Sequence, residues 1–103
     1  MRKAKVFFDN DLAGLLTVSE DGKESHFLYD PAYSGPPISL TMPVRESVYS
    51  FDEFPPFFDG LLPEGFQLEA LLRQRKLDRS DKFGQLLMVG ADTVGAVTVE
   101  GES

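Results

Sequence analysis

The stretch FPPFFDGLLPEGFQLEALL (residues 54–72) decides how this chain folds, because it concentrates apolar side chains in one short segment. It contains four phenylalanines, three prolines and five leucines. Five of the nine phenylalanines of the chain lie between Phe51 and Phe66. A small domain has a limited interior, so such a segment forms core, contact surface or both.

Length and composition place the chain among single-domain globular proteins. Its 103 residues are enough for one hydrophobic core, and 42% hydrophobic with 26% charged residues is a globular composition. The net charge of -7 repels phosphates, which disfavours a free-standing nucleic-acid binder. The absence of cysteine excludes disulfides and thiolate metal sites.

The N-terminus carries no sign of export or membrane insertion. Residues 1–5 run directly into an alternating strand pattern, without the apolar segment that a signal peptide requires. No apolar run approaches the roughly 20 residues that span a bilayer. The sequence therefore predicts a soluble cytoplasmic protein that does not bind membranes.

Alternating apolar and polar residues predict an antiparallel meander in the first half of the chain. Turn chemistry separates three strands, expected at residues 3–8, 12–19 and 25–30. Within the second strand, Leu12, Leu16 and Val18 are expected on one face. In the third strand, Phe27 and Tyr29 share a face.

A fourth strand is predicted over residues 38–42, after a Gly-Pro-Pro break. Its alternation points Ile38, Leu40 and Met42 inward, with a serine and a threonine facing outward. Pro43 cannot donate to a ladder and is expected to end the strand.

The second half of the chain changes to the period of helices. A short helix is predicted over residues 57–62, since the two prolines before it suit a first helical turn. A longer helix is predicted over residues 67–76, with a buried leucine stripe formed by Leu68, Leu71 and Leu72.

A third helix and a closing strand complete the predicted domain. Ser80 is the expected N-cap of the helix, and residues 94–99 form the strand. The apolar side chains of the helix are Phe83, Leu86 and Leu87. Strands followed by helices and a returning strand indicate the α+β class. We expect one domain over residues 1–103, an antiparallel meander or partly closed sheet packed with about three short helices.

The search for catalytic or ligand-binding residues is almost empty. The acidic residues of the first turn resemble a calcium loop, but Ala13 occupies a required ligand position. GADTVG (residues 90–95) has the glycine spacing of a phosphate loop, but Ala96 stands where lysine is needed. His26 is the only histidine, and no nucleophile can be assigned to it. The sequence predicts a protein that is not an enzyme, with no catalytic residue, cofactor or metal.

Half of all lysines and arginines form a basic cluster within ten residues: Arg73, Arg75, Lys76, Arg79 and Lys82. The sequence leaves two interpretations of the basic cluster open. It is either a patch that contacts an acidic partner or a nucleic-acid backbone, or the ordinary basic end of a helix. In the second case, neighbouring carboxylates neutralise it, namely those of Glu69, Asp78 and Asp81.

Phe66 is the most informative single residue. It lies two residues, or about 160° around a helix, from Leu68, and therefore opposite the leucine stripe. It also follows a Pro-Glu-Gly turn, where side chains tend to be presented outward. One interpretation is an aromatic anchor that enters a pocket on a partner. The other is a hydrophobic staple, or burial beneath the strands.

The segment LLPEG (residues 61–65), preceded by FFD (residues 57–59), resembles the signature of the N-terminal subdomain of HipA-like serine/threonine kinases. ISLTMP (residues 38–43) is similar to the family's strand that ends in Leu-Pro or Met-Pro. Residues 90–97 match its closing Gly-x-Asp-x-x-Gly-Ala-Val pattern. One departure is Gly60, where the family carries an asparagine. The three patterns occur in the family's order and span nearly the whole chain.

The resemblance implies a function. The chain ends just after the closing strand, and no nucleotide loop, catalytic aspartate or metal-binding aspartate of a kinase is found in it. It therefore resembles the free-standing form of the subdomain, the HipS family of tripartite HipBST toxin–antitoxin systems. By that resemblance we expect an antitoxin that binds and inhibits a HipT-like kinase toxin. A HipB-like helix-turn-helix protein is expected in the same complex, so that any contact with DNA is indirect.

The same resemblance places the contact with the kinase on the segment around the Pro-Glu-Gly turn, facing the nucleotide-binding lobe. The expected partner-binding residues are Leu62, Pro63, Glu64, Gly65, Phe66 and Gln67. Two other interpretations stay open. One is a structural subunit that assembles the kinase with the DNA-binding protein; the other is the excised regulatory N-subdomain of a longer HipA-like kinase.

Overall fold

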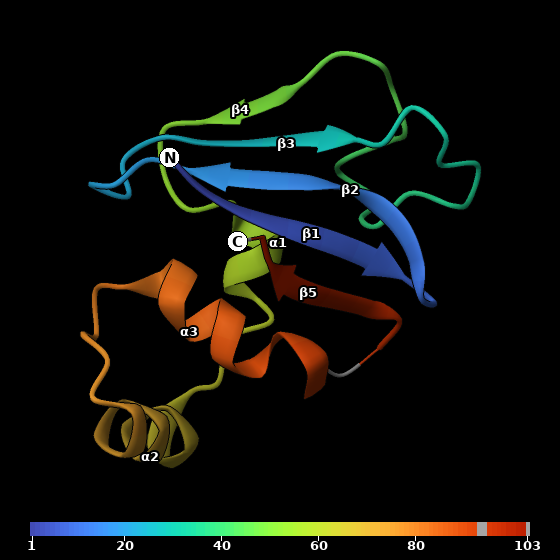
Figure 1. The fold of residues 1–103 in the computed structure, drawn as a ribbon. Helices are drawn as coiled ribbons and strands as arrows, with labels where there is room; N and C mark the ends of the chain where they lie inside the picture. Colours follow the sequence, from blue (N-terminus) through green and yellow to red (C-terminus); the bar gives the residue numbers. More distant parts are fainter. Residues whose placement is uncertain (93–94, 103) are drawn as a thin grey trace.

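Five antiparallel strands form a single sheet in the order β4-β3-β2-β1-β5 (Figure 1). The computed structural model describes residues 1–92 and 95–102 of the chain. The strands are β1 (Arg2–Phe8), β2 (Asp11–Val18), β3 (Ser25–Tyr29), β4 (Tyr49–Phe51) and β5 (Val97–Gly101). The first three follow one another as the predicted meander, β4 extends it, and β5 returns to pair with β1. The described strands therefore leave the sheet open, with β4 and β5 at its edges.

Three α-helices follow the meander in the described part of the chain, and a 3-10 turn precedes β5. They are α1 (Pro56–Asp59), α2 (Gly65–Arg75), α3 (Lys82–Val89) and the turn η1 (Gly90–Asp92). α1 and α3 contribute side chains to the core cluster beside the sheet, whereas α2 stands apart beyond α3 (Figure 1). The predicted α+β class is confirmed, with an open sheet.

The core lies on one face of the sheet, where the alternation of each strand places its apolar side chains. The strands contribute Ala4, Val6, Leu16, Val18, Phe27, Tyr29, Val97 and Val99, all at most 6% exposed. The helices contribute Phe58 from α1, and Phe83 and Leu86 from α3. The rings of Phe27 and Phe58 lie 5.9 Å apart, which packs α1 directly against β3.

A β-bulge corrects the predicted face of β2. Val6 pairs with Gly14 and Phe7 pairs with Leu12, so Ala13 is the extra residue between them. On the N-terminal side of this extra residue, the side chains of β2 therefore point to the opposite faces from those predicted. Ala13 is fully buried, and Leu12 leaves the buried face with 39% exposure. The other two residues predicted on that face are buried.

Residues 38–42 form a turn instead of the predicted fourth strand. The bridge between Ser39 and Met42 is isolated, and the amide of Met42 donates to the carbonyl of Ser39 at 3.1 Å. The prediction for Leu40 is wrong, because it is 100% exposed at the tip of the turn. Ile38 and Met42 are buried as predicted. Flanking prolines lack the amide donors that a strand needs, and β4 takes the fourth place in the meander.

The remaining boundaries differ by a few residues. α1 covers only the first part of the helix predicted over residues 57–62, after which the chain continues in tight turns. The N-cap of α3 is Asp81 rather than Ser80, with its side chain accepting a hydrogen bond from the first helical turn at 3.0 Å. The closing strand begins at Val97, and Val94, its predicted start, lies outside the described residues.

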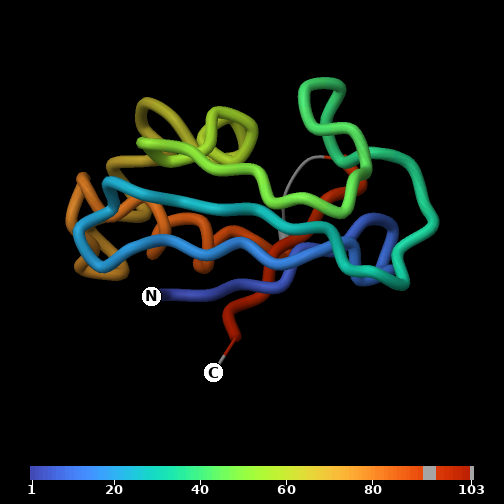
Figure 2. The backbone as a smooth tube through the Cα atoms, turned by 90° about the horizontal axis from the view of Figure 1, so that it is seen from above, coloured from blue at the N-terminus to red at the C-terminus, as the bar shows by residue number. Residues whose placement is uncertain are grey.

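Helix α2 does not join the core. The structure describes all 11 of its residues and none is buried. The leucine stripe predicted as buried is only half-buried and lies outside the core cluster: Leu68, Leu71 and Leu72. Seen from above, α1, the beginning of α2 and the loop of residues 36–43 lie on the same side of the sheet (Figure 2).

Candidate partner-binding site

The predicted contact segment, residues 62–67, joins α1 to α2 at the surface. Leu62 and Pro63 are half-buried, and Leu62 packs against the core. Residues 64–67 are exposed. Gly65 takes a φ of 58°, which L side chains rarely adopt, so the turn into α2 depends on a glycine there. The segment is thus fixed at its start and accessible over the rest of its length.

The exposure of Phe66 excludes the staple and burial alternatives. Phe66 is the second residue of α2, and its side chain is 95% exposed. Leaving a phenylalanine in water forgoes about 1.5–3 kcal/mol that burial provides. Aromatic side chains of this kind are common anchors in protein interfaces. The geometry therefore suits contact with a partner.

The basic cluster separates into paired and unpaired members. Arg79 pairs with Glu69, and the Nζ of Lys82 lies 3.2 Å from the Oδ1 of Asp59. Three members are exposed and form no ion pair with any described residue, namely Arg73, Arg75 and Lys76. Their positive charge is concentrated at the C-terminal end of α2.

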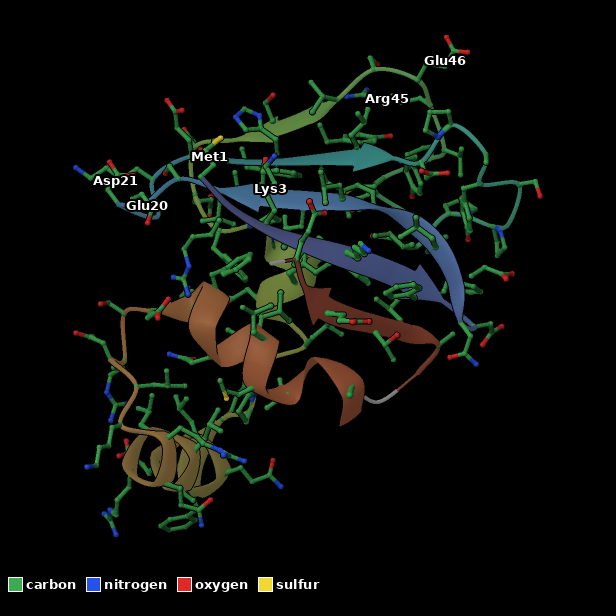
Figure 3. All side chains as sticks on the ribbon, viewed as in Figure 1. Met1, Lys3, Glu20, Asp21, Arg45 and Glu46 are labelled. Atoms are coloured by element: carbon green, nitrogen blue, oxygen red, sulfur yellow. The ribbon has the colours of Figure 1, made fainter. Side chains whose placement is uncertain are left out.

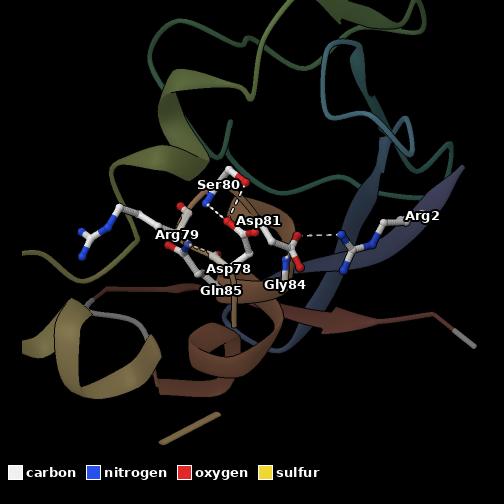
Figure 4. Close-up of polar contacts among 7 residues, drawn as sticks. All are labelled: Arg2, Asp78, Arg79, Ser80, Asp81, Gly84 and Gln85. Atoms are coloured by element: carbon white, nitrogen blue, oxygen red, sulfur yellow. Dashed lines mark hydrogen bonds and ion pairs between the residues drawn. The ribbon is translucent and has the colours of Figure 1, made fainter. Parts of the chain in front are cut away.

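Two of the carboxylates expected to neutralise the basic cluster bind elsewhere (Figure 4). Asp78 accepts hydrogen bonds from the amide and the Oγ of Ser80, at 2.9 and 2.7 Å. These hydrogen bonds hold the pKa of Asp78 below its ordinary value, and the one from the Ser80 amide has the larger effect. The Oδ1 of Asp81 lies 2.7 Å from the Nη1 of Arg2, which links the start of α3 to β1. The end of α2 therefore keeps a charge that an acidic surface could match.

Leu40 is, like Phe66, an apolar residue with an almost fully accessible side chain, and the strand pattern wrongly placed it inside. Its turn is held by Tyr29, whose hydroxyl accepts a hydrogen bond from the amide of Ile38 at 3.0 Å and donates one to the carbonyl of Met42. Burial raises the pKa of Tyr29, so the hydroxyl stays protonated and able to donate. The prolines that flank the turn were the signal in the sequence, since they cannot join a ladder.

Two further tyrosines fix the chain on either side of this turn. The hydroxyl of Tyr33 donates to the carbonyl of Pro36, and that of Tyr49 to the carbonyl of Pro43, both at 2.5 Å. Arg45, labelled in Figure 3 on the loop before β4, places its guanidinium carbon 3.6 Å from the centre of the Tyr49 ring. Side-chain contacts therefore fix the conformation of this loop, which is not part of a strand.

The described residues contain no arrangement that would bind a metal. Among residues 1–92 and 95–102, no three His, Cys, Asp or Glu side chains lie where they could hold a metal ion. His26 lies with its Nδ1 3.1 Å from the Oγ of Ser50, a cross-strand contact between β3 and β4. None of the helices in the described part of the chain is long and apolar enough to cross a membrane.

The fold and the sequence define the class of protein. Residues 4–100 match the family of HipA N-terminal domains, and the chain belongs to that family. The solved N-terminal domain of HipA toxin superposes with a TM-score of 0.77 at 33% sequence identity, over 100% of this chain and 94% of that one.

Individual relatives differ in length. An uncharacterized protein of Haemophilus influenzae is 37% identical over 102 residues, which cover 99% of this chain and 94% of that protein. The putative kinase Y4mE of Sinorhizobium fredii is 30% identical over 101 residues, which cover 94% of this chain but 24% of the kinase.

A larger assembly also contains the fold. A chain in the Shewanella oneidensis MR-1 toxin–antitoxin complex of HipA, HipB and operator DNA superposes with a TM-score of 0.74 at 22% identity. The match covers 94% of this chain and 23% of that chain. At this identity the likeness concerns the fold alone.

Proposed function

We propose that this protein is a non-catalytic antitoxin that binds a HipA-like serine/threonine kinase toxin and inhibits it in the cytoplasm. The observation that carries the proposal is Phe66, 95% exposed at the start of α2 in a domain of the HipA N-terminal family. In the putative kinase Y4mE, the matched region is 24% of the chain, so there the domain is joined to a much larger body. A separate copy could occupy the same place on a kinase in trans.

The contact in this mechanism is made by residues 62–67. Leu62 fixes the segment to the core, Gly65 sets the turn, and Phe66 enters a pocket on the kinase. The segment faces the nucleotide-binding lobe. Inhibition follows either from covering that lobe or from holding its phosphate loop in an unproductive state.

A HipB-like helix-turn-helix protein completes the proposed complex. The net charge of -7 makes direct contact between this chain and DNA unfavourable, so DNA binding belongs to the third component. The assembly of HipA, HipB and operator DNA in Shewanella oneidensis is of the same general kind.

A phosphotransfer assay tests the inhibition directly. A HipA-like kinase of the source organism is purified and assayed with increasing amounts of this chain, in the absence of the DNA-binding protein. We expect activity to fall as the binding sites fill. Full activity at demonstrated saturation would overturn inhibition and favour the assembly subunit. Sequencing the gene for an in-frame stop codon after Ser103 separates either role from an excised kinase subdomain.

The variant Phe66→Ala tests the anchor. We expect affinity for the kinase to fall by about 10- to 100-fold, because central aromatic anchors carry much of an interface's binding energy. The thermal midpoint should stay unchanged, since the side chain is exposed. Met88→Ala, at a position 49% exposed on α3, is the matched control. A loss of stability with unchanged affinity would contradict the anchor.

A further inference from the structure

We propose that the turn of residues 38–42 is a second docking point, which inserts Leu40 into an uncharged apolar pocket of the same kinase. This inference rests on the proposed function. Leu40 is 100% exposed, whereas Ile38 and Met42 on either side of it are 6% and 3% exposed. A fully exposed leucine between two buried neighbours is held outward by the fold, not left outward by a loose chain.

The turn is already in a fixed conformation before any partner binds. One hydroxyl, that of Tyr29, bonds the chain on both sides of the tip, at Ile38 and at Met42. A contact between the side-chain oxygens of Ser39 and Thr41, at 2.9 Å, closes the tip itself. Ordering a flexible loop on binding lowers the affinity. This turn is already ordered in the folded protein, so binding loses little conformational entropy there.

The absence of charge in this segment indicates what the turn can enter. Residues 31–44 (PAYSGPPISLTMPV) contain no Asp, Glu, Lys or Arg, in a chain that is 26% charged. An acidic or basic partner surface would find no matching charge there. A neutral apolar pocket matches it, since placing a leucine in such a pocket removes its apolar surface from water.

The position of the turn indicates which partner covers it. Ile38 and Met42 belong to the same core cluster as Phe58 of α1, so the turn and α1 cover one face of the sheet. The loop of residues 36–43 and the beginning of α2 lie on that same side (Figure 2). The molecule measures 39 × 27 × 26 Å, which is small enough for a single larger partner to contact both the turn and Phe66. In the putative kinase Y4mE about three-quarters of the chain lies outside the matched domain, which supplies a body of that size.

The charge of α2 supports one continuous interface with two chemistries. Arg73, Arg75 and Lys76 lie exposed at the end of α2. The loop that contains the uncharged turn lies at the opposite end of the molecule from α2 (Figure 1). The proposed kinase face therefore carries carboxylates opposite α2 and an apolar pocket opposite Leu40.

The test compares Leu40→Ala and Leu40→Asp with the wild-type chain. Binding to the purified HipA-like kinase of the phosphotransfer assay is measured by calorimetry, with a catalytically inactive variant of that kinase so that phosphorylation does not interfere. We expect about 10-fold weaker binding for Leu40→Ala and about 100-fold or more for Leu40→Asp, as for an interface anchor. Met88→Asp, exposed on α3, should change the affinity by less than about 2-fold.

The controls separate this inference from the proposed function. Unchanged thermal midpoints for both Leu40 variants exclude misfolding as the cause. Binding of Leu40→Asp as tight as that of the wild type, with inhibition intact, overturns the second docking point and leaves the proposed function standing. No binding of the wild-type chain overturns both. Self-association of the wild type that Leu40→Asp abolishes, with kinase binding intact, also overturns the inference, because the turn then binds a second copy of this chain.

Discussion

Helices α1 and α2 come from one apolar stretch of sequence, yet they meet opposite surroundings. α1 buries Phe58 completely, with the Phe27 ring 5.9 Å away across the core. α2 buries no residue of its described length, and it exposes Phe66 almost fully. A short helix is marginal in water by itself, so α1 owes its stability to packing and α2 obtains little from it. An apolar segment can therefore serve both the fold and a partner, with a single turn dividing the two roles.

The turn of residues 38–42 offers a third arrangement within the same molecule. Like α2, it exposes a large apolar side chain; like α1, it is attached directly to the core, through Ile38 and Met42. The turn is not helical, and the hydroxyl of Tyr29 fixes its conformation instead. The comparison of α1 with α2 thus concerns attachment to the core, and it can be tested by removing each attachment in turn.

The largest effect is expected from the pair Phe58→Ala and Phe66→Ala. Phe58→Ala removes a completely buried ring and should lower the free energy of unfolding by about 3–5 kcal/mol. Phe66→Ala removes an exposed ring and should change it by less than about 0.5 kcal/mol. Urea unfolding, followed by far-UV circular dichroism, measures both. Similar losses of stability for the two variants would show that α2 packs in solution as α1 does. They would contradict the difference in burial between the two helices.

An intermediate effect is expected from Tyr29→Phe. The change keeps the buried ring but removes the hydroxyl that bonds Ile38 and Met42. Buried backbone groups are left without partners, which costs about 1–3 kcal/mol of stability. Hydrogen exchange should rise at the amide of Ile38 and not in α1. Tyr33→Phe, whose hydroxyl bonds an exposed carbonyl, is the control with a smaller expected loss.

The same substitution should change the response to alkaline pH. Burial, the largest cause, raises the pKa of Tyr29 in the folded state above its ordinary value of 10.0. The stability linked to this group is therefore fully present below pH 10.0 and is lost as pH rises through the folded-state pKa. Wild-type protein should lose stability above that pH more steeply than Tyr29→Phe does. Parallel pH profiles for the two proteins would mean that Tyr29 ionises freely in the folded state.

Local patterns in the sequence predicted much of the sheet, but they left Phe66 open between an outward anchor and a buried or stapled residue. Strand alternation placed Phe27 and Tyr29 on one face, which the structure buries, and the helical period placed Phe66 opposite the leucine stripe. The bulge at Ala13 escaped prediction, because one inserted residue leaves no mark on composition and reverses the face of Leu12.

Contacts between distant parts of the chain account for the other errors. Leu40 fits a strand pattern, but a hydroxyl from Tyr29, nine residues before Ile38 and thirteen before Met42, closes the segment into a turn. An apolar stripe indicates which side of a helix faces inward, but not how closely the helix approaches the core. The two helices differ in how closely they approach the core, and this distance depends on the whole fold. The contact of residues 62–67 with a kinase stays a prediction.

The smallest effect is expected from the ion pair that tethers α2. Glu69 and Arg79 are 51% and 61% exposed, and their contact links the middle of α2 to the loop that leads into α3. Because water screens exposed pairs, Glu69→Gln should cost no more than about 1 kcal/mol of stability, and the difference from wild type should shrink in 1 M salt. Thermal melts at low and high salt measure both changes. A larger, salt-independent loss would mean that this pair, and not the half-buried leucine stripe, holds α2 in place.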